Sequence, residues 1–332
     1  MMKRITIKDI AKALNMHHST VSRALRADKS VNSETRKRVL AYAHEHGYQI
    51  NRSALHLRGD KSNVIGVVVP NVNHSFFSNI ISKVANLAFE QGYVVSVFQS
   101  NESLQQEKEI VKALIQNNVS GVLASVSMET RSAVHFKKLG DFHIPLVMFD
   151  RVTDDLEVTR VLAKNREIVE HTVDLLVAKG FKQIAHLSGI SEMNVYHDRQ
   201  EGYRMGVRKN GLNYESCTII SNGFTIENGQ QAVKALFDAE VRPDALICDS
   251  HFLLLGAIAE LKERKLDVSS GFGLAGFGGY LETGIIHPGV ISILQPEEEM
   301  ANAAFEALMA EINGLESASR QDLSYSATLI ET

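Results

Sequence analysis

The chain has 332 residues, which suits two or three domains, because a single hydrophobic core rarely grows beyond about 250–300 residues. Its 44% hydrophobic and 22% charged residues are ordinary for a soluble globular protein. The two cysteines, Cys217 and Cys248, are too few for a disulfide-built secreted fold. No early apolar run resembles a signal peptide, and no stretch approaches the roughly 20 apolar residues of a membrane span, so we expect a cytoplasmic protein.

The net charge of −4 conceals an uneven distribution along the chain. Residues 1–60 hold 12 Lys and Arg against 5 Asp and Glu, a charge of +7, whereas the other 272 residues hold 23 against 34, a charge of −11. A small basic head on an acidic body predicts that the head alone meets a polyanion. The alternative is that the basic segment is only a solvated face.

The first residues of the head predict two short helices separated by a tight turn. Thr6 followed by Asp9 is typical of a helix start, and apolar residues then recur with helical spacing up to Leu14. Asn15 follows, and Asn tolerates the left-handed backbone of such a turn. A second helix over His18 to Leu25 places Val21 and Ala24 on one face, with Ser19, Ser22 and Arg23 opposite. This is the helix-turn-helix arrangement, in which the second helix enters the major groove of DNA.

The adjacent histidines His17 and His18 raise the alternative of a metal site. Neighbouring side chains on a helix point about 100° apart, and metal-binding pairs normally have i, i+4 spacing, so we do not expect a metal here. His17 falls where a capping side chain sits, and His18 begins the outward face. DNA reading is the favoured interpretation of His18, and an exposed residue without a partner is the alternative.

A third helix is predicted to start at Asn32 or Ser33 and to end at Gly47. Its buried stripe is expected from Val39, Leu40 and Ala43. The basic residues 36–38 could meet phosphate or form a solvated face, and the sequence favours neither.

The stretch "TIKDIAKALNMHHSTVSRALRADKSVNSETRKRVLAYAHEHGY" resembles the headpiece of the LacI/GalR family of bacterial transcription regulators, and the likeness continues over nearly the whole chain. It implies a headpiece over residues 1–49 and a hinge over 50–60. The resemblance places base-reading residues at His18, Ser19 and Arg23, and phosphate contacts, which fix register, at Thr6, Thr20, Ser22 and Asn32. His17 also falls in this DNA-binding set, where the family usually has a small polar residue.

"NRSALHLRG" (residues 51–59) resembles the family's hinge helix, which folds on operator DNA and pairs with a second copy in the minor groove. The resemblance places Ala54 and Leu57 at hinge positions, with Leu57 as the apolar wedge that kinks the duplex. So short a segment does not hold a helix alone in water, so its order is expected to depend on DNA and on the dimer. Ile50 stands where the family usually has proline.

From residue 64 onward, short apolar runs alternate with amphipathic segments, which predicts an α/β fold with two doubly wound parallel-sheet lobes. The first series of strands is "VIGVVVP", "YVVSVFQ", "GVLAS" and "IPLVMFD", with helices near 76–91, 103–116 and 130–139. The second series is "KQIAHLSG", "CTIIS", "DALICD" and "FGLAGFG", with helices near 165–179, 198–210, 226–238 and 251–264. In such sheets a ligand lies outside the carboxyl ends of the strands.

The resemblance likens residues 61–332 to periplasmic sugar-binding proteins, as an effector-binding and dimerisation domain. It implies that the chain crosses between lobes three times, near 162, 292 and 323. Lobe one would then hold about 61–162 and 293–322, and lobe two about 163–292 and 323–332, including the final "SYSATLIE" strand.

Seven positions match the family's effector pocket: Asn73, Phe76, Asp150, Arg199, Phe224, Asp249 and Gln295. Carboxylates and a guanidinium can hydrogen-bond a polyhydroxylated ligand, and aromatic rings cover its apolar faces. Each position also has a structural alternative, for example a surface ion pair of Asp150 with Arg151, or a core role for Phe76.

Two departures from sugar-responsive relatives bear on the ligand. Cys248 replaces an Asn, and Gly278 with Gly279 replaces an acidic pair. Both changes remove acceptors for sugar hydroxyls, so the prediction of an ordinary neutral sugar as the effector is weaker. His197, Arg199 and Arg151 suit a carboxylate or phosphate as well.

No catalytic constellation, cofactor motif or metal cluster emerges from the sequence, so we expect no enzyme, no cofactor and no membrane partner. The resemblance implies a homodimeric regulator, in a family of mostly repressors, that binds a pseudo-palindromic operator in double-stranded DNA. Its effector is expected to be a sugar, sugar acid or sugar phosphate, with a nucleobase less well matched. The alternatives are a transporter's solute-binding protein and an enzyme that closes two lobes on its substrate.

Overall fold

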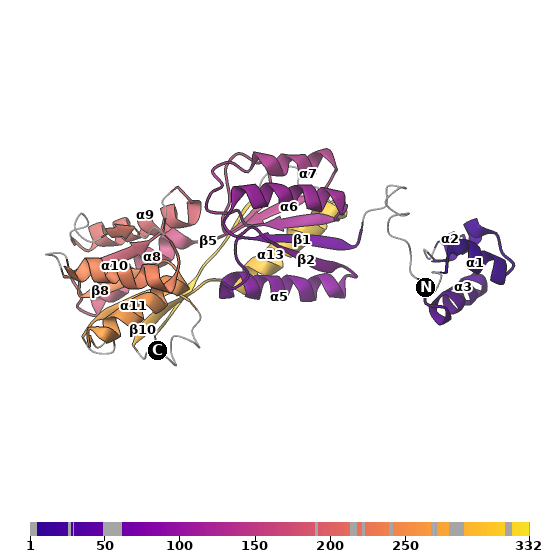
Figure 1. Cartoon of the computed structure of the whole chain (residues 1–332). Coiled ribbons are helices and arrows are strands. Elements are labelled where there is room, and N and C mark those ends of the chain that lie inside the picture. The colour runs from indigo at the N-terminus through magenta and orange to yellow at the C-terminus, as the bar shows by residue number, and fades with distance from the viewer. Residues whose placement is uncertain are drawn as a thin grey trace. The chain divides into compact units, whose positions relative to one another are not determined.

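The computed structural model describes residues 5–25, 28, 30–48, 62–189, 192–212, 218–220, 223–238, 242–266, 268, 271–278, 289–315 and 321–331. The chain forms two compact units, Met1–Lys61 and Ser62–Thr332 (Figure 1). The predicted hinge over residues 50–60, with Ala54 and Leu57, lies outside the described residues.

The N-terminal unit is a three-helix headpiece. Its helices are α1 (Ile7–Ala13), α2 (His18–Leu25) and α3 (Ser33–Glu45). The predicted capping box is confirmed: the Thr6 amide donates to Asp9 Oδ2 (2.8 Å), and the Asp9 amide donates to Thr6 Oγ1 (3.3 Å). Asn15 takes the left-handed conformation (φ 51°) that the tight turn requires.

The core of the headpiece is formed by apolar residues of all three helices. Its buried members are Ile10, Ala11, Val21, Ala24, Val31, Val39 and Ala43. The expectation that Leu40 is buried is wrong, because its side chain is 45% exposed. Leu40 follows Val39 on α3, and consecutive side chains on a helix point about 100° apart, so Val39 faces α1 and α2 whereas Leu40 does not.

Lobe one contains a six-stranded parallel sheet with the strand order β11-β5-β4-β3-β1-β2. Its strands are β1 (Val64–Val69), β2 (Val94–Gln99), β3 (Gly121–Ala124), β4 (Leu146–Phe149), β5 (Arg160–Ala163) and β11 (Asp322–Tyr325). Helices α5 (Ser75–Glu90) and α13 (Glu297–Ile312) contribute to one core, and α6 (Leu104–Gln116) with α7 (Lys137–Asp141) contributes to the other.

The helix expected near 130–139 begins later than predicted. Thr130 donates through Oγ1 to the buried Glu107 carboxylate (2.7 Å), which also accepts from the Ser127 amide (2.8 Å). These bonds hold residues 127–130 as a loop, and a 3₁₀ turn (η1, Val134–Phe136) then leads into α7.

Lobe two has a six-stranded sheet with the order β12-β10-β9-β8-β6-β7. Its strands are β6 (Ile184–Ser188), β7 (Thr218–Ile220), β8 (Ala245–Cys248), β9 (Gly273–Phe277), β10 (Val290–Leu294) and β12 (Thr328–Glu331). Its helices are α8 (Asn165–Ala178), α9 (Asn194–Lys209), α10 (Ile226–Asp238) and α11 (His251–Glu263). Only β12 runs antiparallel to its neighbour, β10, among the described strands of this sheet. Both lobes are therefore α/β layers, as the alternating pattern predicts.

The chain passes between the two sheets after β5, after β10 and after β11 (Figure 1). The expected "SYSATLIE" strand of lobe two is two strands. Its first residues complete β11, where Ser324 and Tyr325 pair with Leu162 and Ala163 of lobe one. The third crossing therefore lies at residues 326–327 rather than near 323, because the pairing with β5 carries β11 three residues further.

Within the described part of the chain, no helix has the length and apolar character needed to cross a membrane.

Candidate functional site

Helix α2 turns a polar face to solvent. Its apolar side chains Val21 and Ala24 are buried against the other headpiece helices, whereas His18 and Arg23 are exposed. Ser19, Thr20 and Ser22 are partly exposed beside them, and Thr6 and Asn32 are exposed at the starts of α1 and α3. The described residues of the predicted DNA-binding set are therefore all accessible at the headpiece surface.

His17 caps helix α2. Its Nδ1 lies 3.4 Å from the Ser19 amide, which donates to it, and 2.8 Å from Ser19 Oγ. The imidazole ring also contacts the ring of His18, with 4.2 Å between centroids. The capping role expected for His17 is thus present in the structure, and no described group of His, Cys, Asp and Glu could hold a metal ion.

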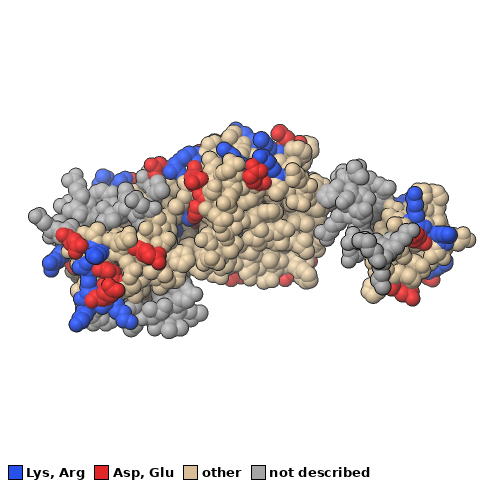
Figure 2. Space-filling model, viewed as in Figure 1, with Lys and Arg blue, Asp and Glu red and all other residues tan. Residues whose placement is uncertain are grey.

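Arg36 serves the headpiece fold itself. Its guanidinium donates to the backbone carbonyls of Asp28 (2.7 Å) and Val31 (3.2 Å), so it secures the segment that leads into α3. Lys37 and Arg38 are exposed. Figure 2 shows blue Lys and Arg side chains along one side of the visible headpiece surface, which is the kind of surface that attracts a polyanion.

In the second unit, a small site lies between the two lobes, at the carboxyl ends of strands from both sheets. Five of the seven predicted effector residues line it: Phe76, Asp150, Arg199, Asp249 and Gln295. Further lining residues that the sequence prediction did not include in the site are His74, Phe77, Arg151, Val195, Tyr196, Ser250 and Phe277. Asn73 is exposed outside the lining, and Phe224 lies behind it, stacked on Tyr196 with 4.8 Å between ring centroids.

The site between the lobes is nearly filled by its own side chains. The cavity measures about 20 Å³, which is room for a single water molecule and far less than a sugar needs. The lobes are thus closed on each other in this structure.

Arg199 lies at the floor of this site, on α9. Its guanidinium stacks on Phe277, 3.4 Å from the ring centroid, while Nε donates to Asn165 Oδ1 (2.8 Å) and Nη1 donates to the Asp249 carbonyl oxygen. Burial lowers the pKa of Arg199 despite its acidic neighbours. These contacts fix the plane of the guanidinium before any ligand arrives.

The carboxylate of Asp249 is held inside lobe two. Oδ1 lies 2.8 Å from His186 Nε2, and Oδ2 accepts from Ser188 Oγ (2.6 Å). Burial alone would raise the pKa of this carboxyl, but His186, Arg199 and Ser188 outweigh burial and lower it. The backbone carbonyl of Asp249 therefore positions Arg199, while the Asp249 carboxylate is paired with His186 and Ser188 of the same lobe.

Asp150 is buried at the end of β4 with a left-handed backbone (φ 57°). Burial raises the pKa of its carboxyl, although Arg151, Arg199 and Gln295 act in the opposite direction. The alternative of a surface ion pair with Arg151 is wrong, because both residues are buried and Arg151 pairs with Glu102 (2.8 Å). For Phe76 the core interpretation is confirmed, and the ring also lines the site.

Arg151 links the two lobes. Its Nη1 reaches Glu102 in lobe one, and its Nη2 donates to the hydroxyl of Tyr196 on α9 (3.1 Å). Asn194 adds two further bonds across the boundary: its Nδ2 donates to the Asp150 carbonyl (2.9 Å), and its Oδ1 accepts from the Val152 amide (3.1 Å). The sequence-based prediction of the site did not include Tyr196. This residue precedes Arg199 by three positions and therefore lies on the same face of the helix.

His74 lines the same site, and His251 lies close enough to act on its charge. Burial, together with Arg151, His251 and Arg199, lowers the pKa of His74 to about 3, so the ring is neutral at ordinary pH. A Cβ on Gly278 would lie 2.6 Å from His251 Nδ1. The absence of a side chain at Gly278 therefore leaves space for this imidazole.

Sequence comparison matches this architecture to one family. Residues 62–329 match the periplasmic binding proteins and sugar-binding domain of the LacI family, and residues 6–51 match the bacterial regulatory proteins of the lacI family. The chain belongs to the LacI family. LacI-family proteins are non-enzymatic DNA-binding transcriptional regulators that carry an effector-binding domain.

Individual LacI-family relatives align over nearly the whole chain. The transcriptional repressor CytR of Escherichia coli K12 is 29% identical over 316 residues, covering 93% of this chain and 90% of CytR. Catabolite control protein A of Priestia megaterium is 24% identical and covers 93% of both chains. Among solved structures, the lac repressor dimer bound to operator superposes with a TM-score of 0.84 at 21% identity, covering 99% and 98% of the two chains. The Cra regulator of Pseudomonas putida with fructose 1-phosphate superposes with a TM-score of 0.73 at 20% identity, covering 81% and 98%.

Proposed function

We propose that this LacI-family protein is a homodimeric repressor that binds a pseudo-palindromic operator and releases or tightens its hold when a small molecule binds between the lobes. DNA binding is proposed because α2 exposes a polar face to solvent. The buried core of the headpiece holds α2 in this orientation. In this proposal His18, Ser19 and Arg23 read bases, while Thr6, His17, Thr20, Ser22 and Asn32 contact phosphates or position α2. Ala54 and Leu57 act in the hinge.

The dimer is proposed to form through α5 and β2 of lobe one. Phe89 is 78% exposed at the end of α5, and Val94 and Val97 are exposed on β2, an edge strand of the sheet. Exposed apolar side chains on an edge strand favour association with another chain. Figure 2 shows that the surface over these elements is largely uncharged on the visible face. A second copy would cover both features and place two headpieces on two half-sites.

The effector is proposed to be a sugar or sugar derivative that carries an anionic or acceptor-rich group. Arg199 and Arg151 offer donors, and Phe77, Tyr196 and Phe277 offer aromatic faces. The Cra complex with fructose 1-phosphate and a CelR complex with cellobiose, both of the same fold, support such ligands. Because the closed cavity admits about one water molecule, the ligand must part the lobes, so it favours an opened arrangement over the present one.

Operator binding tests the proposal directly. Full-length protein should select a two-half-site sequence from a random duplex library, and its affinity should fall steeply as salt rises, because bound phosphates release counterions. Arg23→Ala should relax the selected sequence, whereas Lys37→Ala, an exposed cation on α3, should weaken binding without changing the selection. Failure to select any sequence at low salt would contradict the proposal and would favour the rival function of a solute-binding protein, which the two lobes also suit.

A further inference from the structure

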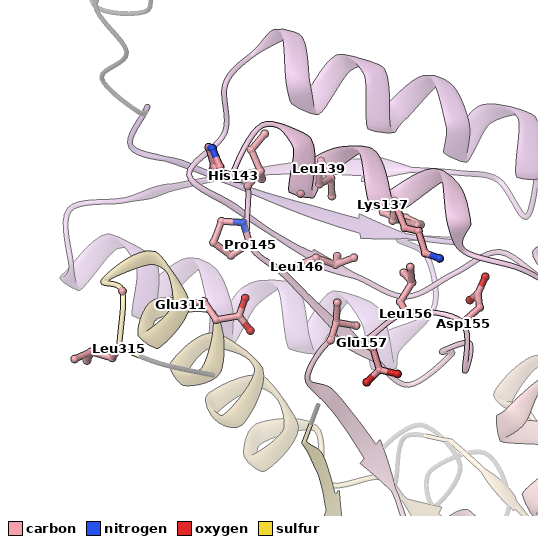
Figure 3. Close-up of a pocket in the computed structure, with 15 residues that line it drawn as sticks. Lys137, Leu139, His143, Pro145, Leu146, Asp155, Leu156, Glu157, Glu311 and Leu315 are labelled. Carbon is pink, nitrogen blue, oxygen red and sulfur yellow. The ribbon is translucent and has the colours of Figure 1, made fainter. Parts of the chain in front are cut away.

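A second cavity lies in lobe one, away from the site between the lobes. It measures about 620 Å³ and shares no lining residue with the inter-lobe site (Figure 3). Its walls come from α7, from the segments that precede β4 and β5, and from the last turn of α13. Cavities of this size are typical of small-molecule sites.

The cavity exists because β4 and β5 diverge. The two strands pair only at Met148 with Arg160 and at Phe149 with Val161. Before these pairs, the chain at residues 155–158 leaves the sheet, and the cavity lies beside it, over Leu146 and Leu156, which are 6% and 3% exposed. A continuous sheet would have closed this volume.

The floor of the cavity is apolar and its walls are acidic. Leu139, Leu146 and Leu156 belong to the lobe-one core and form the floor. Asp155, Glu157 and Glu311 contribute carboxylates to the lining, against Lys137 as the one Lys or Arg among all the lining residues. The lining thus combines hydrophobic contact with an excess of negative charge.

Glu311 is the carboxyl best placed to bind a ligand. Figure 3 shows it extending from α13 into the cavity, toward Leu146. Glu311 is half-buried, and burial raises the pKa of its carboxyl. None of the described side chains donates a hydrogen bond to it or forms an ion pair with it. Asp155, in contrast, already accepts from Ser132 Oγ (2.6 Å) and the Ala133 amide (3.2 Å). A half-buried carboxyl without a partner gains free energy from a cation that arrives with an apolar body.

We propose that this cavity is a ligand site for an organic ammonium compound, with the amine on Glu311 and an aromatic or aliphatic body against Leu315, which is 65% exposed in the lining. The site is separate from the effector site between the lobes. Helix α13 joins the two, because it begins two residues after Gln295 and carries Glu311 in its last turn. Sixteen helical residues separate its ends by about 24 Å.

Tryptamine is a suitable probe, and 3-indolepropionate is its matched control, because the two share an indole on a two-carbon chain and differ in the charge at its end. Titration calorimetry on full-length protein should show tryptamine binding at least tenfold tighter than 3-indolepropionate. Glu311→Gln should weaken tryptamine binding at least tenfold, whereas Glu306→Gln, an exposed carboxylate on the same helix, should leave it unchanged.

A filling variant locates the bound probe. A Cβ at Gly140 on α7 meets no atom within 4 Å, so Gly140→Leu should fold and occupy the cavity, abolishing tryptamine binding. Gly140→Ala, which adds one methyl group, should preserve binding. The proposal is overturned if tryptamine does not bind, if the carboxylate probe binds equally well, or if Glu311→Gln or Gly140→Leu binds tryptamine like the wild type.

Discussion

Arg151 of lobe one donates a hydrogen bond to the hydroxyl of Tyr196 of lobe two, over 3.1 Å. The same guanidinium donates to Glu102 over 2.8 Å. Because Glu102 holds Arg151 in lobe one, a movement of Tyr196 with lobe two would break its hydrogen bond to Arg151. Burial would lower the pKa of Arg151, but Tyr196, Glu102 and Asp150 outweigh burial and raise it. The cation is therefore present in this contact at every ordinary pH.

Removing the Tyr196 hydroxyl should loosen the closed arrangement of the lobes. Tyr196→Phe keeps the ring on Phe224 and loses one buried hydrogen bond to a charged donor, so we expect unfolding to become about 1–3 kcal/mol easier. Spin labels on α6 and α10 should report a broader distance distribution between the lobes. Tyr325→Phe, whose hydroxyl has no described partner, should change neither measurement; equal effects of both variants would contradict the role of Tyr196.

The neutral ring of His74 should make stability depend on pH. Its folded pKa of about 3 lies below its ordinary value of 6.5, so the unfolded chain binds the proton first and stability falls as pH drops from about 6.5 toward 3. Replacing His74 with Gln removes this dependence, and urea unfolding at pH 7 and pH 4.5 should differ less in His74→Gln than in the wild type, by about 1–2 kcal/mol.

His197→Gln is the matched control, because His197 is exposed on α9. It should retain the wild-type difference between the two pH values. If His74→Gln retains that difference as well, the ring does not carry the pH dependence.

His17 should act on DNA binding through the helix it caps. His17→Ala removes the acceptor for the Ser19 amide, which we expect to cost α2 about 0.5–2 kcal/mol and to weaken operator binding accordingly. His17→Asn supplies another capping oxygen and should restore most of the affinity. Hydrogen exchange of the α2 amides measures the cap, and fluorescence anisotropy with operator DNA measures the binding. Wild-type exchange in His17→Asn with the same loss of affinity as in His17→Ala would mean that the imidazole contacts DNA itself.

Gly202 should tolerate no side chain. It lies where α9 crosses α8, and a Cβ there would stand 2.2 Å from the Arg166 carbonyl oxygen, so the two helices would have to move apart. We expect Gly202→Ala to destabilise the protein by about 3 kcal/mol or more in urea unfolding. Gly140→Ala, on another helix with open space around it, should be neutral or slightly stabilising. Equal stability of the two variants would show that the α8–α9 contact yields.

Local signals in the sequence predict the elements of this fold well. The capping box at Thr6 and Asp9 involves residues three positions apart, and the apolar runs of the strands are readable one by one. Strand ends are less accessible to prediction. Ser324 belongs to lobe one only because it pairs with Leu162, and nothing near Ser324 in the sequence indicates that partner.

The site between the lobes shows the same division. Positions after strand ends converge as parallel sheets require, which brings Phe76, Asp150 and Gln295 together. The direction of a side chain depends on distant neighbours, so the sequence could not show that the Asp249 carboxylate turns toward His186, 63 positions away. The sequence did not predict Tyr196 as a site residue, because an aromatic residue on a helix usually belongs to the hydrophobic core.

The three passages of the chain between the sheets have a consequence for synthesis on the ribosome. One core of lobe one is closed by α13, whose residues Met300, Phe305 and Leu308 are fully or almost fully buried against strands that were made some 200 residues earlier. Until residue 312 emerges, the nascent first lobe exposes that apolar surface, and such surfaces favour aggregation. A transcript interrupted before the codons for α13 therefore yields no half-functional regulator, because neither lobe is encoded by a contiguous piece of the gene.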